Sequence, residues 1–389
     1  MPATHSTQRI TDIPVLYMAI ELSVKSWNLG FTVGLGQDPR IRAIAGGDYD
    51  ALLHEIRLAK VRFGLAADAP IVSCYEAGLH GFHPHRRMLE LGINNIVVDS
   101  ASIEVNRRKK SPKSDRLDAR KLAAMLVRWS MGEKAWRVVN VPSVKDEDGR
   151  QLHRELMGLK QERTEHTNRI KGLLFTSGFH AHVDSRFPER LECLRQLKQD
   201  PLPEELYKRL LREFERWNLV EAQIRQLEKD RAGRIRNEKS PQADKVRKLL
   251  GLRGVGQNSA WLLVHEVFGW RQIKNRRQLG GIAGLAPTQY ASGDSEREQG
   301  ISKAGNRRLR ALLIELAWSW LRYQPESALT LWYLRRFAGG NSRQRRIGIV
   351  ALARKILVTL WKYLDREEVP EGAVVVPWQN KLKLAGPCL

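Results

Sequence analysis

The stretch Lys113-Ser114-Asp115-Arg116-Leu117-Asp118-Ala119-Arg120 organises the first half of the chain. A Ser-Pro pair precedes it and apolar residues at helical spacing follow, which predicts a helix over 113–128 that Ser114 caps. Asp115 and Asp118, three residues apart, then project from one helix face. Paired carboxylates in a basic segment suit a divalent cation held against a phosphate backbone. The pair equally suits an ordinary acidic first turn that favours the helix dipole.

Strands and helices alternate before this stretch. Apolar runs predict strands, the first two as a hairpin, and amphipathic runs predict helices: strands at 15–20, 27–33, 71–75 and 93–98, helices at 49–58 and 82–91. This order predicts an α/β domain with a largely central sheet. Glu21 and Glu76 each end a predicted strand, where such sheets place their sites. With Asp115 and Asp118 they would bind two divalent ions for phosphodiester chemistry, although either glutamate alone also fits a solvated strand end.

The charge of the chain points to a polyanionic partner, most simply nucleic acid, because the formal net charge is +23 and the pI is about 10.2. Residues 1–100 are neutral, with 9 Lys or Arg against 10 Asp or Glu. Residues 101–140 hold 11 against 4, and residues 245–310 hold 13 against 4. The positive charge is therefore concentrated in two segments, and the aspartate pair lies within one of them.

The three cysteines, Cys74, Cys193 and Cys388, are isolated in the sequence. This spacing argues against a disulfide scaffold or a zinc site and fits a reducing cytoplasm. The N-terminus lacks the apolar region of a signal peptide, and no stretch of bilayer length is free of charge. We therefore expect a cytoplasmic protein without a membrane partner.

The composition changes between 144 and 236, where two apolar stripes at steps of three and four are separated by proline breaks. This pattern predicts a long helical hairpin, in the form of a coiled coil, that serves as a spacer or dimerisation arm. Farther on, Gly251-Leu252-Arg253-Gly254-Val255-Gly256 predicts a glycine turn between two helices. Such a helix-hairpin-helix turn can grip DNA phosphates through backbone N–H groups, although tight helix packing also needs glycines. The basic run 271–277 favours the nucleic-acid interpretation.

A loop rich in Gly and Ser is predicted to lead from about 284 into a helix whose first turn is rich in arginine. Ser292 precedes Gly293 and is free to be exposed, and guanidinium groups nearby could hold a scissile phosphate. A serine hydroxyl needs such help to attack, but from spacing alone Ser292 also fits an ordinary turn. A last basic helix is predicted over 341–364, with an extended or loose tail from Val369.

Taken together, these residues resemble the DEDD transposases of bacterial insertion sequences, the bridge-RNA-guided serine recombinases. The resemblance covers most of the chain. It rests on Ala19-Ile20-Glu21-Leu22-Ser23, Tyr75-Glu76-Ala77-Gly78 and 114–120 in the first half, and on 251–256, 284–287, Ser292-Gly293 and 301–307 in the second. It implies an RNase H-like (RuvC-like) catalytic domain at 12–135, a coiled-coil dimerisation region at 144–240, a mainly α-helical transposase domain with the serine loop at 245–340, and a basic C-terminal helix and tail at 341–389.

The resemblance also implies the chemistry. Glu21, Glu76, Asp115 and Asp118 would be catalytic and hold one or two Mg²⁺ ions, and Ser292 would attack the phosphodiester to form a covalent protein–DNA intermediate. The first of the four acids is usually Asp, so Glu21 departs from the family by one methylene. The partners implied are the element ends and target DNA, a structured noncoding guide RNA, and further copies of the chain, as a dimer and as a tetramer in the synaptic complex. The location implied is the bacterial cytoplasm, at the nucleoid.

The expected nucleic-acid contacts share a basic side chain or a glycine turn. They are Arg107, Arg108, Lys109, Lys110, Lys113, Arg253, Gly254, Gly256, Arg276, Arg277, Lys303, Arg307, Arg308 and Arg310. Two alternatives remain open: a RuvC-type metal-dependent junction nuclease that leaves Ser292 idle, and a non-catalytic nucleic-acid-binding remnant.

Overall fold

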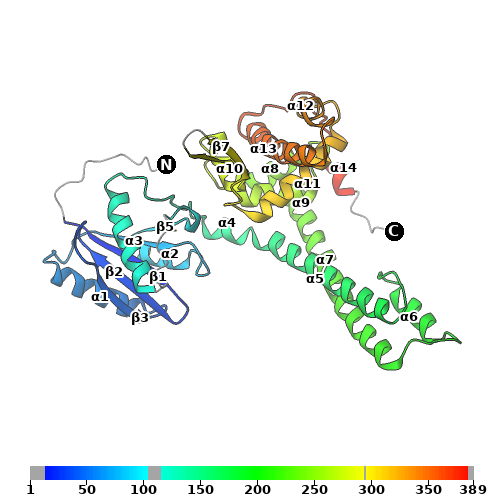
Figure 1. Cartoon of the computed structure of the whole chain (residues 1–389), viewed down its shortest axis with the longest axis horizontal. Coiled ribbons are helices and arrows are strands. Elements are labelled where there is room, and N and C mark those ends of the chain that lie inside the picture. Colours follow the sequence, from blue (N-terminus) through cyan, green and yellow to red (C-terminus); the bar gives the residue numbers. More distant parts are fainter. Residues whose placement is uncertain (1–13, 104–114, 293–294, 384–389) are drawn as a thin grey trace. The chain divides into compact units, whose positions relative to one another are not determined.

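The computed structural model describes residues 14–103, 115–292 and 295–383. The chain divides between Val141 and Pro142 into two compact units (Figure 1). The first unit contains β1 (Leu16–Leu22), β2 (Ser26–Thr32), β3 (Arg40–Ala45), α1 (Tyr49–Arg62), β4 (Ile71–Glu76), α2 (His83–Glu90), β5 (Asn94–Val98), η1 (Ser100–Ser102) and α3 (Asp115–Ser130).

The first unit is built on a five-stranded mixed sheet in the order β3-β2-β1-β4-β5. β1 pairs antiparallel with β2 and parallel with β4, and β4 pairs parallel with β5. Met18 and Ile20 pack with α1 and α2 on one face, whereas Ala19 and Cys74 pack with α3 on the other. A strand covered on both faces must be apolar throughout, which is why β1 reads as a continuous apolar run. The predicted α/β class is confirmed.

One strand was not predicted. β3 pairs only with β2 and therefore forms an edge of the sheet. Its residues are half-buried or exposed, and Arg40 and Arg42 interrupt the apolar pattern. Charged side chains are a common feature of edge strands, because they discourage pairing with another chain. Because of these charges, the sequence has no apolar run here that would predict a strand.

The helix α3 begins at Asp115, two residues later than predicted, and continues to Ser130. Ser114, its predicted cap, lies outside the described residues. The helix lies close to the sheet at Gly30, where a Cβ would be 2.9 Å from the carbonyl oxygen of Ala119. Only glycine permits this approach, so Gly30 fixes where the first turns of α3 lie on the sheet.

The second unit is mainly helical. Its elements are α4 (Val144–Asp148), α5 (Gln151–Thr176), α6 (Phe187–Arg195), α7 (Glu204–Asn237), α8 (Pro241–Leu250), α9 (Gln257–Leu263), η2 (Val264–Phe268), α10 (Arg276–Ala283), β6 (Pro287–Ser292), β7 (Ser295–Ile301), α11 (Arg307–Tyr323), α12 (Ala328–Phe337), α13 (Ser342–Arg366) and α14 (Gln379–Lys383).

α5 and α7 form the predicted helical hairpin, called the arm below, and α6 packs beside α7 (Figure 1). Leu156 and Leu159 of α5 meet Val220 and Ile224 of α7 in a small core along the arm. α8, α10, α11 and α12 pack against α13, and one large core joins these helices with α9 and with Leu152 at the start of α5. The arm and the helical body therefore share a core within this unit.

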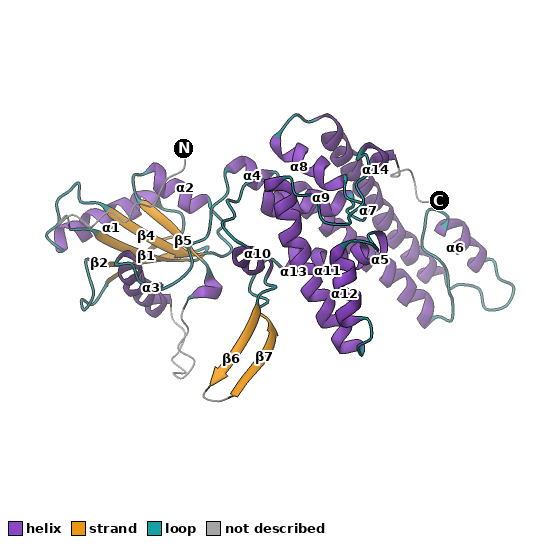
Figure 2. Cartoon of the chain, turned by 90° about the horizontal axis from the view of Figure 1, so that it is seen from above, coloured by secondary structure: helices purple, strands orange, loops and turns teal. Residues whose placement is uncertain are grey.

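Two predictions in this unit were wrong. The loop expected to carry Ser292 is a two-stranded antiparallel ribbon of β6 and β7, which projects from the helical body (Figure 2). Ser292 pairs with Ser295, and residues 293–294 lie outside the described residues. The tail after Val369 is not simply extended, because Val375 bridges to Leu252 and α14 follows.

Candidate functional site

Glu21 and Glu76 lie side by side at the ends of two neighbouring parallel strands. The last paired residues of β1 and β4 are Ile20 and Tyr75, directly before the two glutamates. Side chains alternate along a strand, and Ala19 and Cys74 face α3. Both glutamates therefore belong to the α3 face of the sheet. Glu21 is half-buried and Glu76 is exposed.

The first turns of α3 lie against the same face. Ala119 contacts Gly30, which pairs with Ala19, the same-face neighbour of Glu21. Asp118, adjacent to Ala119, is half-buried. Asp115 is the first residue of the helix, and its side chain lies outside the description.

Glu21 and Glu76 share the face of the sheet that α3 covers. Among the side chains that the structure describes, no three imidazole, thiol or carboxylate groups are close enough to hold one metal ion. Carboxylate oxygens are nevertheless the ligands that Mg²⁺ prefers, so the donor set fits the ion in its chemistry. The structure thus brings Glu21 and Glu76 together and places the helix of Asp115 and Asp118 across the same face.

Ser292 is the last residue of β6, at the tip of the ribbon, and its side chain is not described. The base of the ribbon is tightly packed. A Cβ on Gly305 would lie within 2.6 Å of three backbone atoms between Gly281 and Gly284. A guanidinium nitrogen of Arg310 donates to the carbonyl oxygens of Ala283 and Lys303, at 3.2 and 3.1 Å. Gly305 and Arg310 therefore fix the base from which the ribbon projects.

The predicted nucleic-acid contacts fall into groups. Arg310 is half-buried at the base of the ribbon. The other described basic side chains of this set are exposed: Arg253, Arg276, Arg277, Lys303, Arg307 and Arg308. Gly254 has φ +87°, and Gly256 is exposed at the start of α9. Arg107, Arg108, Lys109, Lys110 and Lys113 lie outside the described residues.

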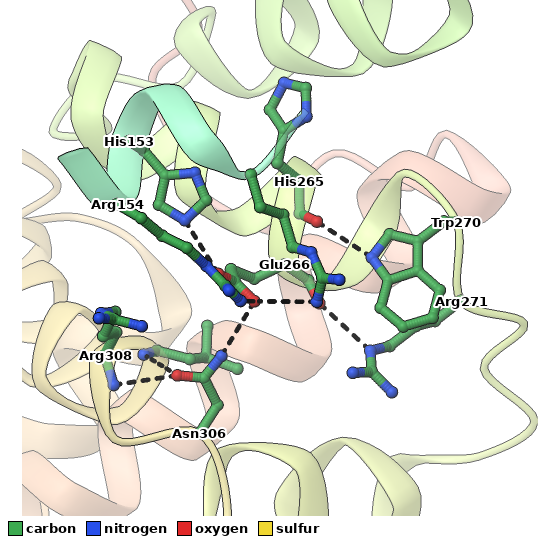
Figure 3. A network of polar contacts seen from close by, with 10 residues as sticks. His153, Arg154, His265, Glu266, Trp270, Arg271, Asn306 and Arg308 are labelled. Atoms are coloured by element: carbon green, nitrogen blue, oxygen red, sulfur yellow. Dashed lines mark hydrogen bonds and ion pairs between the residues drawn. The ribbon is translucent and has the colours of Figure 1, made fainter. Parts of the chain in front are cut away.

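The prediction from sequence missed a buried carboxylate, Glu266, in the second unit (Figure 3). Glu266 lies in η2, a π-helical turn, and is 2% exposed. It accepts hydrogen bonds from Nε2 of His153 at 2.9 Å and from Nε of Arg154 at 3.0 Å. Its other oxygen accepts from Nδ2 of Asn306 at 3.1 Å and lies 4.0 Å from a guanidinium nitrogen of Arg150. A charged residue inside the apolar run Trp261–Phe268 was the available signal.

This network joins three segments. His153 and Arg154 belong to α5, while Asn306 caps α11 by accepting from the backbone N–H groups of Arg308 and Leu309, at 3.0 and 3.1 Å. Burial acts to raise the pKa of Glu266, but the hydrogen bonds from His153 and Arg154 outweigh it and lower the pKa to about 2. Glu266 is therefore ionised and can only accept, so Nε2 of His153 carries the proton.

Two neighbours of Glu266 have shifted pKa values. Burial, reinforced by the neighbouring His153, lowers the pKa of His265 to about 4. Burial and the charge of Arg150 lower the pKa of Arg271 to about 10, so its guanidinium remains charged at neutral pH. The side chain of Arg271 also lies over the ring of Trp270, with Cζ 4.1 Å from its centroid. Glu266 thus offsets the positive charge of Arg150, which is buried, and of Arg154, which is partly exposed.

No helix within the described ranges is both long enough and apolar enough to cross a membrane.

Comparison with known proteins assigns the family. Residues 246–331 match the family described as "Transposase IS116/IS110/IS902 family". The chain is 38% identical to "Putative transposase y4rJ" of Sinorhizobium fredii, over 94% of this chain and 95% of the relative. It is 29% identical to a "Probable family 20 transposase" of Pseudomonas aeruginosa, over 80% and 89%. It is also 29% identical to "Transposase for insertion sequence element IS1111A" of Coxiella burnetii, over 74% and 75%. The chain therefore belongs to the IS116/IS110/IS902 family of insertion-sequence transposases.

Proposed function

We propose that this transposase is an RNA-guided DNA recombinase that exchanges strands through a serine–DNA intermediate. The observation that carries the proposal is the shared sheet face of Glu21 and Glu76, which the helix of Asp115 and Asp118 crosses. Four carboxylates on one face repel one another unless a cation lies among them. A sheet ordered β3-β2-β1-β4-β5 with this helix on one face also supports an RNase H-like first domain.

In this proposal Ser292 is the nucleophile. Its Oγ bonds to the phosphorus, the bond from phosphorus to one nucleoside oxygen breaks, and the serine proton passes to the departing oxygen. The phosphoserine ester preserves the bond energy for strand exchange. The four acids would hold Mg²⁺, which when bound stabilises negative charge on the phosphate and the departing oxygen. Exposed Arg307 and Arg308 are available to hold phosphate oxygens bidentately.

The partners proposed are DNA and a structured RNA, because the 66 Lys and Arg residues outnumber the 43 Asp and Glu residues and leave a net charge of +23. Base pairing by the RNA would supply most target specificity. The arm of α5 and α7 is the proposed dimerisation region, and a tetramer would form when two DNA sites are brought together.

A denaturing gel tests the chemistry. Protein with its RNA, Mg²⁺ and labelled element-end DNA should give a retarded protein–DNA adduct. The adduct should be absent with Ser292→Ala, with Asp118→Asn, and when Mg²⁺ is chelated. An adduct formed by Ser292→Ala at the wild-type level would overturn the nucleophile assignment.

The sheet face alone also supports a second function, a metal-dependent junction nuclease. That enzyme would use the four acids and water, and it would release nicked DNA without an adduct. Cleavage that persists in Ser292→Ala but disappears in Asp118→Asn would identify it. Binding without any cleavage would indicate a non-catalytic remnant.

A further inference from the structure

A groove of about 2170 Å³ lies in the second unit between α7 and the turn that precedes α9. Its lining includes Arg231 on α7, the segment 253–259, and Lys381 of α14. The predicted nucleic-acid contacts Arg253, Gly254 and Gly256 line the groove, but Arg231 was not predicted and the strand-exchange mechanism above does not use it.

The two ends of the groove differ in charge. Toward the arm, Glu221 pairs with Arg163 at 2.8 Å and Glu228 pairs with Lys160 at 2.7 Å, so that end is locally balanced. The whole lining nevertheless holds nine Lys or Arg against five Asp or Glu. The excess positive charge therefore lies toward the glycine turn.

At the turn end, Arg231, Arg234 and Arg253 form no ion pair with any residue that the structure describes. Two of the acids in the lining already accept hydrogen bonds: Asp230 accepts from Gln226 at 2.9 Å, and Glu238 accepts from Ser240 at 2.7 Å. The guanidinium groups are thus left without a carboxylate of their own.

Arg231 is the unusual member of the lining because it is only 4% exposed. Its NH1 donates to Oδ1 of Asn258 at 3.3 Å, while its Nε is buried with no partner among the described residues. Burial lowers the pKa of Arg231. A buried charge with one hydrogen bond and no ion pair is costly and is seldom retained for stability alone. Its unused donor points to an anionic ligand.

The turn opposite Arg231 is open to a close approach. A Cβ on Gly256 would meet no atom within 4 Å, so this position faces empty space. Nζ of Lys381 donates to the carbonyl oxygens of Leu252 and Val255, which holds the turn in place. The backbone at Gly256 is therefore both fixed and uncovered.

We propose that this groove binds the phosphodiester backbone of a nucleic-acid strand, with Arg231 as a buried phosphate ligand and Gly256 as the point of closest approach. The inference rests on the proposed function, because it assigns an additional binding surface to the recombinase. A phosphate oxygen would accept from the unused donors of Arg231 in a charge-assisted hydrogen bond. Backbone binding carries no sequence preference, so the groove would hold a strand whose sequence is read elsewhere.

The decisive variant is Arg231→Met, which keeps much of the side-chain volume and removes the charge. Its affinity for a labelled 20-nucleotide single-stranded DNA, the matching RNA, and the DNA duplex is measured in chelator over a range of salt concentrations. We expect about tenfold weaker binding to at least one probe at 0.1 M salt. The slope of the logarithm of affinity against the logarithm of salt concentration should be smaller in magnitude by about one. The probe most affected identifies the strand that occupies the groove. The urea midpoint should stay the same or rise, since an unpaired buried charge is removed.

Arg212→Met is the matched control, because Arg212 is exposed on the same helix and does not line the groove. Unchanged affinity and salt slope in folded Arg231→Met, or an equal loss in Arg212→Met, would overturn the proposal. If Arg231→Met does not fold, Gly256→Val decides, because it adds bulk where the structure has open space. Wild-type binding by Gly256→Val would then count against the groove. The assay needs no catalysis, so its outcome is independent of whether the serine adduct forms.

Discussion

The two units hold their carboxylates in opposite ways. In the first unit, Glu21 and Glu76 lie near the carboxyl ends of β1 and β4, where Glu21 is half-buried and Glu76 is exposed. In the second unit, Glu266 is 2% exposed and is surrounded by His153, Arg154 and Asn306. A carboxylate that reaches solvent can be approached by a cation from solution, whereas a buried one is committed to the donors around it. The comparison separates acids suited to chemistry from an acid that holds the fold.

The largest expected effect is on activity, in the first unit. Glu21→Gln should lower the rate of adduct formation by about 10³-fold or more, because it removes a charge that faces the proposed metal and phosphate. The urea midpoint should change less than it does with Glu266→Ala, since Glu21 is half-buried whereas Glu266 is 2% exposed. Single-turnover kinetics with labelled DNA measure the rate. Glu90→Gln, at an exposed residue of α2, is the control and should react normally.

The largest expected effect on stability is in the second unit. Glu266→Ala should cost about 3–5 kcal/mol of unfolding free energy, because it leaves Arg150, Arg154 and His153 without their carboxylate. Urea denaturation followed by circular dichroism measures the loss. Glu215→Ala, at an exposed position on α7, should change stability by less than about 0.5 kcal/mol. If Glu266→Ala and Glu215→Ala had the same urea midpoint, Glu266 would not be a carboxylate that stabilises the second unit.

Acid should destabilise the second unit in two steps. The pKa of His265 is lowered from 6.5 to about 4, so the unfolded chain binds a proton first and stability falls as pH drops from 6.5 to 4. The pKa of Glu266 is lowered from 4.5 to about 2, so its contribution is complete above pH 4.5 and is lost as pH falls toward 2. Each step amounts to about 3 kcal/mol.

Thermal melting between pH 7 and pH 3 tests these steps. His265→Phe keeps an aromatic ring against Trp261, whose ring centroid is 4.3 Å away, and should flatten the dependence between pH 6.5 and 4. The slope below pH 4 should survive in this variant, because Glu266 is intact. A variant as steep as wild type in the upper window would show that another group titrates there.

The smallest expected effect concerns the position of α3 on the sheet. Gly30→Ala would place a methyl group 2.9 Å from the carbonyl oxygen of Ala119 and 3.3 Å from Cδ1 of Ile41. We expect a loss of about 2 kcal/mol and weaker activity, since the helix of Asp115 and Asp118 must shift. Gly158→Ala, exposed in the middle of α5 with no atom near its Cβ, should instead gain up to about 1 kcal/mol. Urea midpoints of the two variants should therefore move in opposite directions.

The elements of the first unit could largely be predicted from local pattern. Apolar runs marked β1, β2, β4 and β5 because strands buried on both faces must be apolar along their length. The same rule could not find β3, because Arg40 and Arg42 interrupt its apolar pattern. Ser292 was expected in a loop because Gly and Ser around it are turn residues, although ladder pairing with β7 makes it a strand end.

The sequence by itself determined the α/β and helical divisions, the positive segments, and the strand ends that carry Glu21 and Glu76, because these depend on residues close together in the chain. Only the tertiary structure decided that Glu266 contacts His153, Arg154 and Asn306. The first two lie more than 100 positions before it in the chain, and Asn306 lies 40 positions after it. It also decided that Arg231 faces the glycine turn across a groove. Such contacts depend on how helices pack, and helix packing is set by the whole apolar surface rather than by any one motif.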